Sequence, residues 1–434
     1  PAPAPGEDSP SWRGNPALVG APSGRVGDYP FAGLRILDLG VIVAGGELGR
    51  LFGDLGAEVI KVESPDYPDG LRQARAGEAM SESFAWTHRN QLGLGLDLRS
   101  AEGGEIFGRL VSGADAVFAN FKPGTLTALG FSYETLHALN PGLVLAESSA
   151  YGGTGPWSTR MGYGPLVRAA TGVTRLWTAN DQGDDPGDTA RHVFYDATTI
   201  FPDHVVGRIT AIAALAALIR CHRTGGGAHV HVSQAEAVVN QLDTLYVTSA
   251  AVAAGRAHVQ PDTSLHAICP CSGDDEWCVI SITSDAEWRS AADLMDHAEW
   301  VEDPRFATAP ARLAHRRELV ELMSSWTRTR TPTRIAGLLQ SAGVPAAPMN
   351  RPPDLLDDPQ LTRRNLFSDM VHPLIPHPLP AETGPAPFLH IPQAPQRPAP
   401  QPGHDTREIC RTVLGMSDRE IERLLAERVV FAPA

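Results

Sequence analysis

Short apolar runs, separated by polar or glycine-rich stretches, follow one another along the first part of the chain. Residues 34–39 and 56–63 each form such a run, which predicts two buried strands. Between them we expect a glycine-containing turn at 44–46 and a helix at 47–55. A strand, a helix and a second strand in this order form a β-α-β unit. The pattern therefore predicts a doubly wound α/β domain.

The strongest single pattern lies in the middle of the chain, where residues 205–219 are almost all apolar. They predict a long helix that ends at the three glycines 225–227. Asp203 precedes the apolar run, and we expect it to be the N-cap residue, with its carboxylate accepting first-turn N–H groups. An alternating strand at 228–232 follows, and residues 233–236 have the sequence of a capping box that opens another helix.

Elements of both kinds recur further along the chain. Strands are predicted at 143–149 and 277–283, and helices at 286–296 and 417–427. Residues 1–30 are rich in proline, glycine and serine and show no hydrophobic period, which predicts a tail or a surface arm.

Composition narrows the possible classes of function. The 434 residues carry a formal net charge of −14, which argues against an extended nucleic-acid surface. The five cysteines are few and odd in number, so we expect reduced thiols in a cytoplasmic protein. The longest apolar run, within 209–219, is too short to span a bilayer, and we therefore predict a soluble protein without membrane contact.

Local motifs predict neither a metal nor a nucleotide cofactor. The three cysteines within 269–278 fit no closed four-ligand zinc pattern. His229 and His231 share one face of a predicted strand, but the sequence suggests no further ligand, so we predict no metal site. The glycines at 45–46 do not form the six-residue dinucleotide fingerprint, which argues against a nicotinamide cofactor.

The residues around the central helix form a recognisable order. Asp203 stands four residues before Gly207, and the chain continues through Arg223-Thr-Gly-Gly-Gly227 to Val232-Ser-Gln-Ala-Glu236. This order resembles the central signature of CoA-transferase family III, the CaiB/BaiF family. The resemblance covers roughly residues 33–430 and is densest in three segments: 33–63, 114–156 and 203–237.

The resemblance implies a role for individual residues. Asp203 would be the nucleophile that becomes an aspartyl-CoA thioester. Contacts with CoA are implied for eight residues: Ile42, Val43, Ala44, Leu96, Arg99, Asn120, Phe121 and Lys122. Possible acceptor-site or supporting roles are implied for Tyr163, Gly164 and Gly207.

The resemblance also implies an architecture. A large Rossmann-like parallel-sheet domain would be built from both ends of the chain, with a small α/β domain inserted between them. The implied bounds are an N-terminal arm or linker at 1–32, the first part of the large domain at 33–225, a linking helix at 226–250, the small domain at 251–345, and a return linker with the rest of the large domain at 346–434. Two such chains would interlock in a homodimer.

Departures from the family pattern keep two alternatives open. Gly46 stands where relatives usually carry proline, and residues 91–92 stand where they carry two basic side chains. Tyr163 occupies the place of the histidine acid/base of the family's racemases, and Gly164 the place of an acidic residue common in transferases. A two-base proton exchange lacks its groups here, which disfavours an acyl-CoA racemase or isomerase. The third possibility is a non-catalytic CoA-binding subunit, which Gly46 and Gly164 favour and the retained Asp203 opposes.

The leading hypothesis is a CoA-transferase that moves CoA from an acyl-CoA to a small carboxylic acid. CoA thioesters are then substrates, and no tightly bound cofactor or metal is required. A carboxylate is a weak nucleophile in water, so Asp203 must be held ionised, partly desolvated and in line with the thioester carbonyl. The amides of the turn following Asp203, or those of residues 43–45, are candidate donors to the tetrahedral intermediates.

Overall fold

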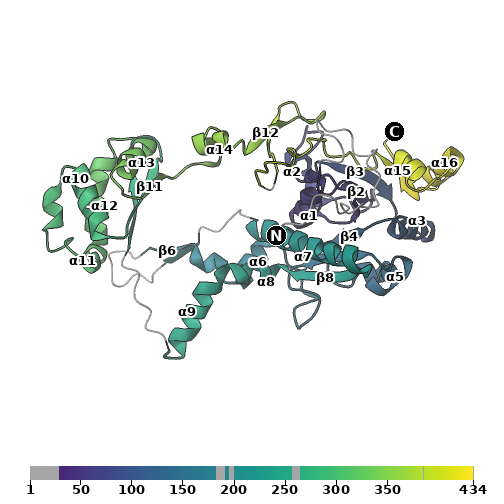
Figure 1. Ribbon diagram of the computed structural model, residues 1–434, viewed down its shortest axis with the longest axis horizontal. Helices are drawn as coiled ribbons and strands as arrows, with labels where there is room; N and C mark the ends of the chain where they lie inside the picture. The colour runs from purple at the N-terminus through teal and green to yellow at the C-terminus, as the bar shows by residue number, and fades with distance from the viewer. Residues whose placement is uncertain (1–28, 182–190, 195–199, 257–263, 385, 434) are drawn as a thin grey trace, which may run out of the picture. The chain divides into compact units, whose positions relative to one another are not determined.

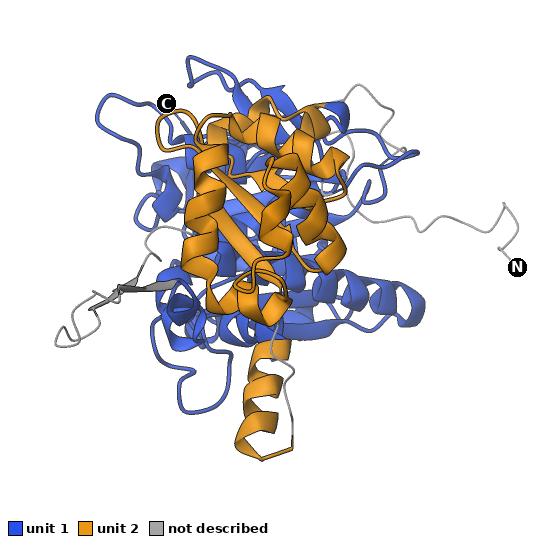
Figure 2. Ribbon diagram, turned by 90° about the vertical axis from the view of Figure 1, so that its left-hand side faces the viewer, with its two compact units in different colours: residues 1–243, 363–434 blue, residues 244–362 orange. Residues whose placement is uncertain are grey.

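The structure is a computed structural model (Figure 1) that describes residues 29–181, 191–194, 200–256, 264–384 and 386–433. Nearly all of the arm predicted at 1–32 lies outside these residues. Two compact units are distinguished in Figure 2: residues 1–243 together with 363–434 form unit 1, and residues 244–362 form unit 2.

Unit 1 contains a seven-stranded sheet in the order β14-β3-β2-β1-β4-β5-β8. Its strands are β1 (Arg35–Asp38), β2 (Glu58–Glu63), β3 (Gln91–Leu96), β4 (Ala116–Ala119), β5 (Val144–Ser149), β8 (Ala228–Ser233) and β14 (Val430–Phe431). Neighbouring strands from β3 to β8 pair in parallel, whereas β14 pairs with β3 antiparallel. The predicted α/β class with a mostly parallel sheet is therefore confirmed. The order 3-2-1-4-5 places the topological switch between β1 and β4.

Helices cover both faces of this sheet, because successive strand residues point to opposite sides. On one face, Leu48 and Phe52 of α1 (Ile42–Asp54) and Leu218 of α7 (Phe201–Thr224) pack in one core cluster with Ile36 and Val59 of the strands. The other cluster joins β1–β5 to α3 (Ala101–Ser112), α5 (Tyr133–Leu139), α15 (Thr406–Thr412) and α16 (Asp418–Ala426). Segments from both ends of the chain thus share one core.

Shorter elements connect or border these layers in unit 1. They are the helices α2 (Glu82–Thr87), α4 (Thr125–Ala128), α6 (Gly164–Ala170) and α8 (Gln234–Val239), and the two-stranded sheets β6 (Thr178–Asp181) with β7 (Arg191–Phe194) and β12 (Phe367–Met370) with β13 (Leu379–Glu382). Helix α14 (Pro359–Arg363) lies at the boundary between the two units in the sequence.

Unit 2 has its own sheet and core. Its three antiparallel strands follow the order β11-β10-β9, with β9 at Leu265–Pro270, β10 at Trp277–Ile282 and β11 at Ala346–Pro348. The helices are α9 (Asp243–Ala253), α10 (Asp285–Leu294), α11 (Ala309–Ala314), α12 (Arg316–Thr327) and α13 (Pro332–Ser341). Buried Trp288, Phe306 and Leu319 lie in one cluster with the strands, which gives this unit a core separate from those of unit 1.

Two predicted helix starts are wrong. Helix α1 begins at Ile42, so residues 44–46 lie within it and do not form a turn before it. The N–H of Ile42 donates to the carboxylate of Asp69 at 3.0 and 3.1 Å, so a residue 27 positions away caps this helix. Helix α7 begins at Phe201 with Pro202 in its first turn, and Asp203 is therefore inside the helix instead of being its N-cap.

Helix α7 is longer than the apolar run that predicts it. Its 24 residues are long and apolar enough, by length and composition, to cross a membrane. In the structure this helix contacts α1, β5 and α8. About a third of its most apolar 18-residue stretch is buried. These contacts are those of a helix that covers one face of a sheet (Figure 1).

Candidate functional site

The turn between β1 and α1 lies at the switch point of the sheet. The side chain of Asn120, directly after β4, holds this turn through two hydrogen bonds. The amide group of Asn120 accepts from the N–H of Val41 at 2.7 Å and donates to its carbonyl at 2.8 Å. Gly40 and Gly45 approach each other so closely that a Cβ on Gly45 would lie 2.5 Å from the Gly40 Cα. Glycine at this position therefore permits the tight turn.

Ile42 adopts a left-handed conformation directly after this turn. Its φ of 56° is unfavourable for a β-branched residue, and such strain persists only where surrounding contacts hold it. Here the Asp69 carboxylate holds Ile42 by accepting a hydrogen bond from its N–H. The same carboxylate accepts a hydrogen bond from the Lys61 ammonium group at 3.0 Å. The Ile42 side chain is consequently turned outward and is 47% exposed.

Three buried charged residues, Asp38, Lys61 and Asp69, interact at the ends of β1 and β2. Burial alone would raise the pKa of Asp69, but His88, whose Nε2 lies 3.2 Å from Asp69 Oδ2, and the charge of Lys61 outweigh it and hold the pKa below its usual range. The pKa of Asp38 is shifted in the opposite direction. Burial raises it to about 7, although the positive charge of Lys61 acts to lower it. Lys61 also donates to the carbonyl of Gly40 at 2.7 Å, which connects this network to the β1–α1 turn.

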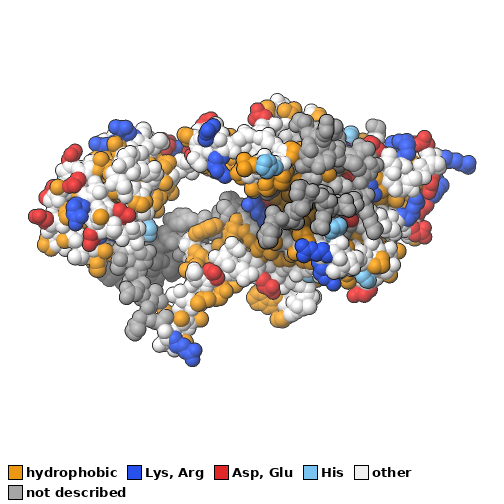
Figure 3. All heavy atoms as spheres, in the orientation of Figure 1, with side chains coloured by type: hydrophobic (Ala, Val, Ile, Leu, Met, Phe, Trp, Pro, Cys, Tyr) orange, Lys and Arg blue, Asp and Glu red, His pale blue; other side chains and the backbone are white. Residues whose placement is uncertain are grey.

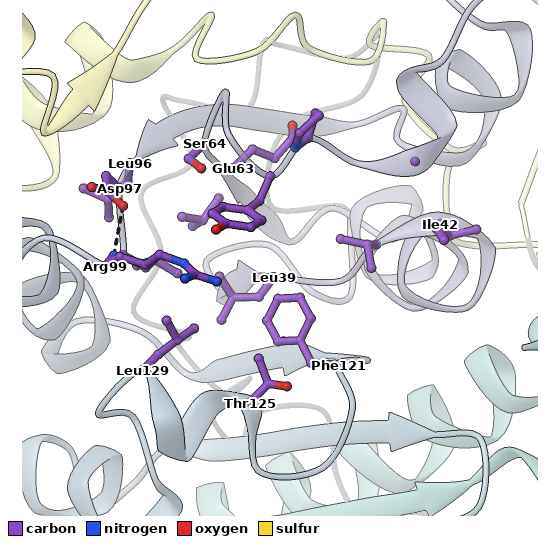
Figure 4. Close-up of a pocket in the computed structure, with 16 residues that line it drawn as sticks. Leu39, Ile42, Glu63, Ser64, Leu96, Asp97, Arg99, Phe121, Thr125 and Leu129 are labelled. Carbon is purple, nitrogen blue, oxygen red and sulfur yellow. Dashed lines mark hydrogen bonds between the residues drawn. The ribbon is translucent and has the colours of Figure 1, made fainter. Parts of the chain in front are cut away.

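A cavity of about 390 Å³ opens above these strand ends (Figure 4). Its walls come from the segments that follow β1, β2, β3 and β4, which is where open α/β sheets bind ligands. Leu39, Phe121 and Leu129 supply apolar surface, and Arg99 brings a positive charge to the same space. The Arg99 guanidinium lies 4.2 Å from the centre of the Tyr67 ring. The cavity thus combines apolar surfaces with the cation of Arg99, and Glu63 and Asp97 also belong to its lining.

Asp203 lies in the first turn of α7 and is 9% exposed. Its Oδ2 atom accepts no hydrogen bond from the described residues. Burial raises the pKa of this carboxyl, and Gln234, His204 and Arg168 oppose the rise. The site therefore holds a desolvated carboxylate that keeps one oxygen free of hydrogen bonds.

Two glycines permit close packing around the first turns of α7. A Cβ on Gly164, the first residue of α6, would lie 2.2 Å from Asp203 Oδ2. A Cβ on Gly207 would lie 2.8 Å from the Glu47 Cβ and 3.1 Å from the Ala44 carbonyl oxygen. Gly207 therefore permits α7 to pack directly on the first turn of α1.

Glu47 connects the two helices at this crossing. Its buried carboxylate accepts from Arg208 of α7 at 2.9 Å and from Arg50 of α1 at 2.8 Å, and it lies 3.3 Å from His204. Burial would raise the pKa of Glu47, but the hydrogen bond from His204 and the charge of Arg50 lower it well below the usual range. An ionised Glu47 thus holds the residue that follows Asp203.

The structure places the predicted site residues in two groups within unit 1. Ile42, Leu96, Arg99 and Phe121 line the cavity. Asn120 closes the turn beside it, whereas Val43 and Ala44 are buried in α1 and the Lys122 side chain is exposed; none of these four lines the cavity. Gly164 lies against Asp203, whereas Gly207 lies against Glu47 and Ala44 of α1, and the Tyr163 side chain is 61% exposed.

Several residues of the site were not predicted. Tyr67 and Asp69 belong to a short irregular stretch after β2 that has no hydrophobic period to draw attention to it. Lys61 and Glu63 did leave a signal, because charged residues within a buried strand are unusual and need partners. Glu47 and Gln234 approach Asp203 or its neighbours only through the packing of helices far apart in the sequence.

Comparison with known proteins gives consistent matches. The family model for CoA-transferase family III matches residues 31–406. A probable CoA-transferase of Mycobacterium tuberculosis, Rv1866, is 70% identical over 434 residues, which are all of this chain and 54% of that protein. The chain therefore spans about half the length of this relative.

Two further matches cover nearly the full length of the other protein. The succinyl-CoA–D-citramalate CoA-transferase of Chloroflexus aurantiacus is 30% identical over 411 residues, with 92% of this chain and 98% of that protein aligned. The crystal structure of a CaiB/BaiF family protein from Brucella suis is similar with a TM-score of 0.74 at 29% identity, covering 88% of this chain and 98% of that one.

Proposed function

Because this chain belongs to CoA-transferase family III, we propose that it moves CoA from an acyl-CoA donor to a carboxylic acid acceptor through a thioester on Asp203. The observation that carries the proposal is the Asp203 carboxylate, which is buried in the first turn of α7 with Oδ2 free of hydrogen bonds. A carboxylate in this state is a better nucleophile than one in water, because no hydration shell has to be removed before attack.

The nucleotide end of CoA would occupy the cavity above the strand ends. Its volume of about 390 Å³ lies within the range of small-molecule sites. Apolar walls at Leu39 and Phe121 suit a planar base, and the Arg99 guanidinium suits a phosphate group. The β1–α1 turn, which carries Ile42 at the cavity wall, leads directly into the helix that packs on α7 near Asp203.

The proposed reaction proceeds in four acyl-transfer steps. An oxygen of Asp203 attacks the thioester carbonyl, and CoA leaves as a thiolate while a mixed anhydride forms. The thiolate then attacks the Asp203 carbonyl, which releases the donor acid and leaves the aspartyl-CoA thioester. The acceptor carboxylate attacks this thioester, forms a second anhydride and expels the thiolate again. Attack of the thiolate on the acceptor acyl carbon yields the new acyl-CoA and regenerates Asp203.

Developing negative charge in these steps requires hydrogen-bond donors. The N–H groups of Val43 and Ala44 lie in the first turn of α1, where backbone N–H groups lack intrahelical partners. The Gly207 contact with Ala44 brings this turn next to α7. These amides are the donors that we assign to the tetrahedral intermediates.

Covalent trapping tests the proposal. The protein is incubated with a panel of acyl-CoAs, beginning with succinyl-CoA because of the name of the Chloroflexus relative, and treated with borohydride or hydroxylamine. Peptide mass spectrometry should find the modification at Asp203. It should be absent from Asp203→Ala and Asp203→Asn and retained in Asp418→Asn, which changes an exposed aspartate in α16.

Other outcomes point to the two alternatives. Binding of CoA thioesters without any label on Asp203 would favour a non-catalytic binding subunit. Exchange of the α-proton for deuterium without an acceptor would favour a racemase or isomerase. Exposed Tyr163 and the glycine at 164 offer no acid–base pair for that exchange, which is why the transferase is preferred.

The quaternary state and the domain division belong to the same proposal. An interlocked homodimer is supported by exposed apolar side chains on α9, namely Leu245, Tyr246, Val247 and Val252. Figure 3 shows hydrophobic side chains at the surface along this helix. A large domain at 33–225 and 346–434 and a small domain at 251–345 are supported by the two compact units. A cytoplasmic location remains a prediction from the sequence.

A further inference from the structure

A cluster of two histidines and a glutamate lies between the last two strands of the large sheet. His229 and His231 are on β8, and Glu147 is on β5, where it is directly opposite His231 in the parallel register. The side chains share one face of the sheet because residues at i and i+2 of a strand point to the same side. One ligand atom from each residue lies within 4.8 Å of the other two, and no other such group occurs among the described residues.

We propose that Glu147, His229 and His231 form a binding site for a divalent transition metal of the Zn²⁺ type. Two imidazoles and one carboxylate are a ligand set that zinc accepts, with a fourth position left for water or another oxygen. Ser149 is a candidate for that position, since its hydroxyl lies 2.8 Å from His231 Nε2, a contact that metal binding to this nitrogen would replace. This site is separate from the Asp203 chemistry and does not rest on the proposed function.

The geometry requires little rearrangement for metal binding. His229 Nε2 already lies 2.7 Å from Glu147 Oε2, so a metal would replace this hydrogen bond with two coordinate bonds. Both rings are held in place: the Tyr133 ring stacks on His229 at 5.2 Å, and Gly153 passes so close to His231 that a Cβ there would lie 2.8 Å from Nδ1. Supported ligands of this kind lose little conformational freedom on binding.

Access and partial burial also suit a metal ion. The Glu147 side chain is 15% exposed, whereas His229 is 37% exposed and opens the cluster to solvent. An ion can therefore enter through His229 and reach a carboxylate that is largely shielded from water. The third ligand was missed in the sequence because Glu147 and the histidines are 82 or more residues apart and meet only through the pairing of β5 with β8.

A bound metal would link β8, which lies at the edge of the sheet, to the neighbouring strand β5. β8 ends at Ser233, the N-cap of α8, and the next residue is Gln234, which faces Asp203. Because the unfolded chain does not bring the three ligands together, a metal that binds the folded state alone stabilises it. We therefore expect the ion to stabilise the β5–β8 pair rather than to take part in catalysis.

The experiment uses the full chain, stripped with EDTA and dialysed, and titrated with Zn²⁺ in a calorimeter. We expect one ion per chain and a rise of a few degrees in the melting temperature at saturation. His231→Ala and Glu147→Gln should each weaken binding by about 100-fold or more, because they remove a ligand. The matched control is His377→Ala, which removes an exposed histidine paired with Glu82 at 3.0 Å and should leave binding unchanged.

Co²⁺ provides a second readout that does not depend on stability. In a site with two nitrogens and one carboxylate it should give the visible absorption of a four-coordinate ion, and His229→Ala should abolish that absorption. Absence of stoichiometric Zn²⁺ binding by the wild-type chain would overturn the proposal and leave the cluster as an ion pair only. Equal affinity in the wild type and both ligand variants would overturn it as well, because the ion would then bind elsewhere.

Discussion

At the scale of single residues, the absence of a side chain at position 164 defines the surroundings of Asp203. Gly164 occupies the place where the family commonly has an acidic residue, and in this structure its backbone lies against Asp203 Oδ2. There is no space for a second carboxylate here while Asp203 keeps its position. In the proposed reaction, the acceptor acid fills the space that remains beside Asp203.

Gly164→Ala tests this arrangement. The added Cβ would lie 2.2 Å from Oδ2, so either Asp203 or the start of α6 must move. We expect transferase turnover and borohydride labelling of Asp203 to fall by about 100-fold, because a displacement of about 1 Å at a reacting atom has that effect. The loss in free energy of unfolding should be about 1–3 kcal/mol, as for other overpacked sites.

The matched control is Gly337→Ala in α13, where an added Cβ meets nothing within 4 Å. It should keep full turnover and gain up to about 1 kcal/mol in stability, the usual helix preference of alanine over glycine. A Gly164→Ala variant with turnover within twofold of the wild type would show that Asp203 does not need its position against α6.

At the scale of elements, the sequence predicts most of the parallel sheet but not how its ends are held. The apolar runs at 34–39, 56–63 and 143–149 correspond to β1, β2 and β5, because buried parallel strands are apolar on both faces. The start of α1 was wrong because its cap comes from Asp69, which local sequence does not connect to Ile42.

The candidate site divides in the same way. Arg99 and Phe121, which were taken from the family resemblance, line the cavity directly after β3 and β4. The polar network beneath them was missed, since it joins Asp38 of β1 with Lys61 of β2 and Asp69 beyond it.

The buried carboxyl of β1 gives the protein a measurable pH dependence. Burial raises the pKa of Asp38 to about 7, so the folded protein binds this proton more tightly than the unfolded chain does. The free energy of unfolding contributed by Asp38 must therefore fall as the pH rises from about 4 to about 7. Glu47 and Asp69, whose pKa values are lowered, act in the opposite sense, and their contribution is lost only as the pH falls below about 4.5.

Asp38→Asn isolates this effect. We expect the variant to become more stable relative to the wild type as the pH rises from 4 to 7. Above pH 7 the difference in unfolding free energy should stay constant. Urea unfolding at a series of pH values measures it, with Asp418→Asn on the surface as the control that shows no such trend. A pH-independent difference for Asp38→Asn would mean that Asp38 is ionised throughout this range.

At the scale of the whole molecule, apolar surface remains on the outer side of α7. Ile212 is 70% exposed and borders a groove of about 440 Å³ that also contains Phe31, Leu51 and Leu215. Contiguous apolar surface of this kind commonly marks an interface with another protein. In the proposed homodimer, the second chain covers it.

Ile212→Glu tests the homodimer. A charge buried without a partner is costly, so we expect the dimer to dissociate at least 10-fold more readily than in the wild type. Light scattering during size-exclusion chromatography, over a range of protein concentrations, measures this change. Leu139→Glu is the control, because Leu139 is 45% exposed on α5 over the opposite face of the sheet. A monomeric wild type would refute the homodimer, and an unchanged Ile212→Glu dimer would place its interface elsewhere.

The pairing of β14 with β3 also has a consequence for how the protein is made. Gly93 of β3 donates its N–H to Asp405, 312 residues later, and Leu96 pairs with Val430. A ribosome adding about 5–20 residues per second needs about 15–60 s to cover that distance. During this time β3 has an open edge, and all three strands of the sheet in unit 2 are synthesised before β14. Until β14 has been synthesised, the nascent chain thus depends on something else to keep β3 from pairing with other chains.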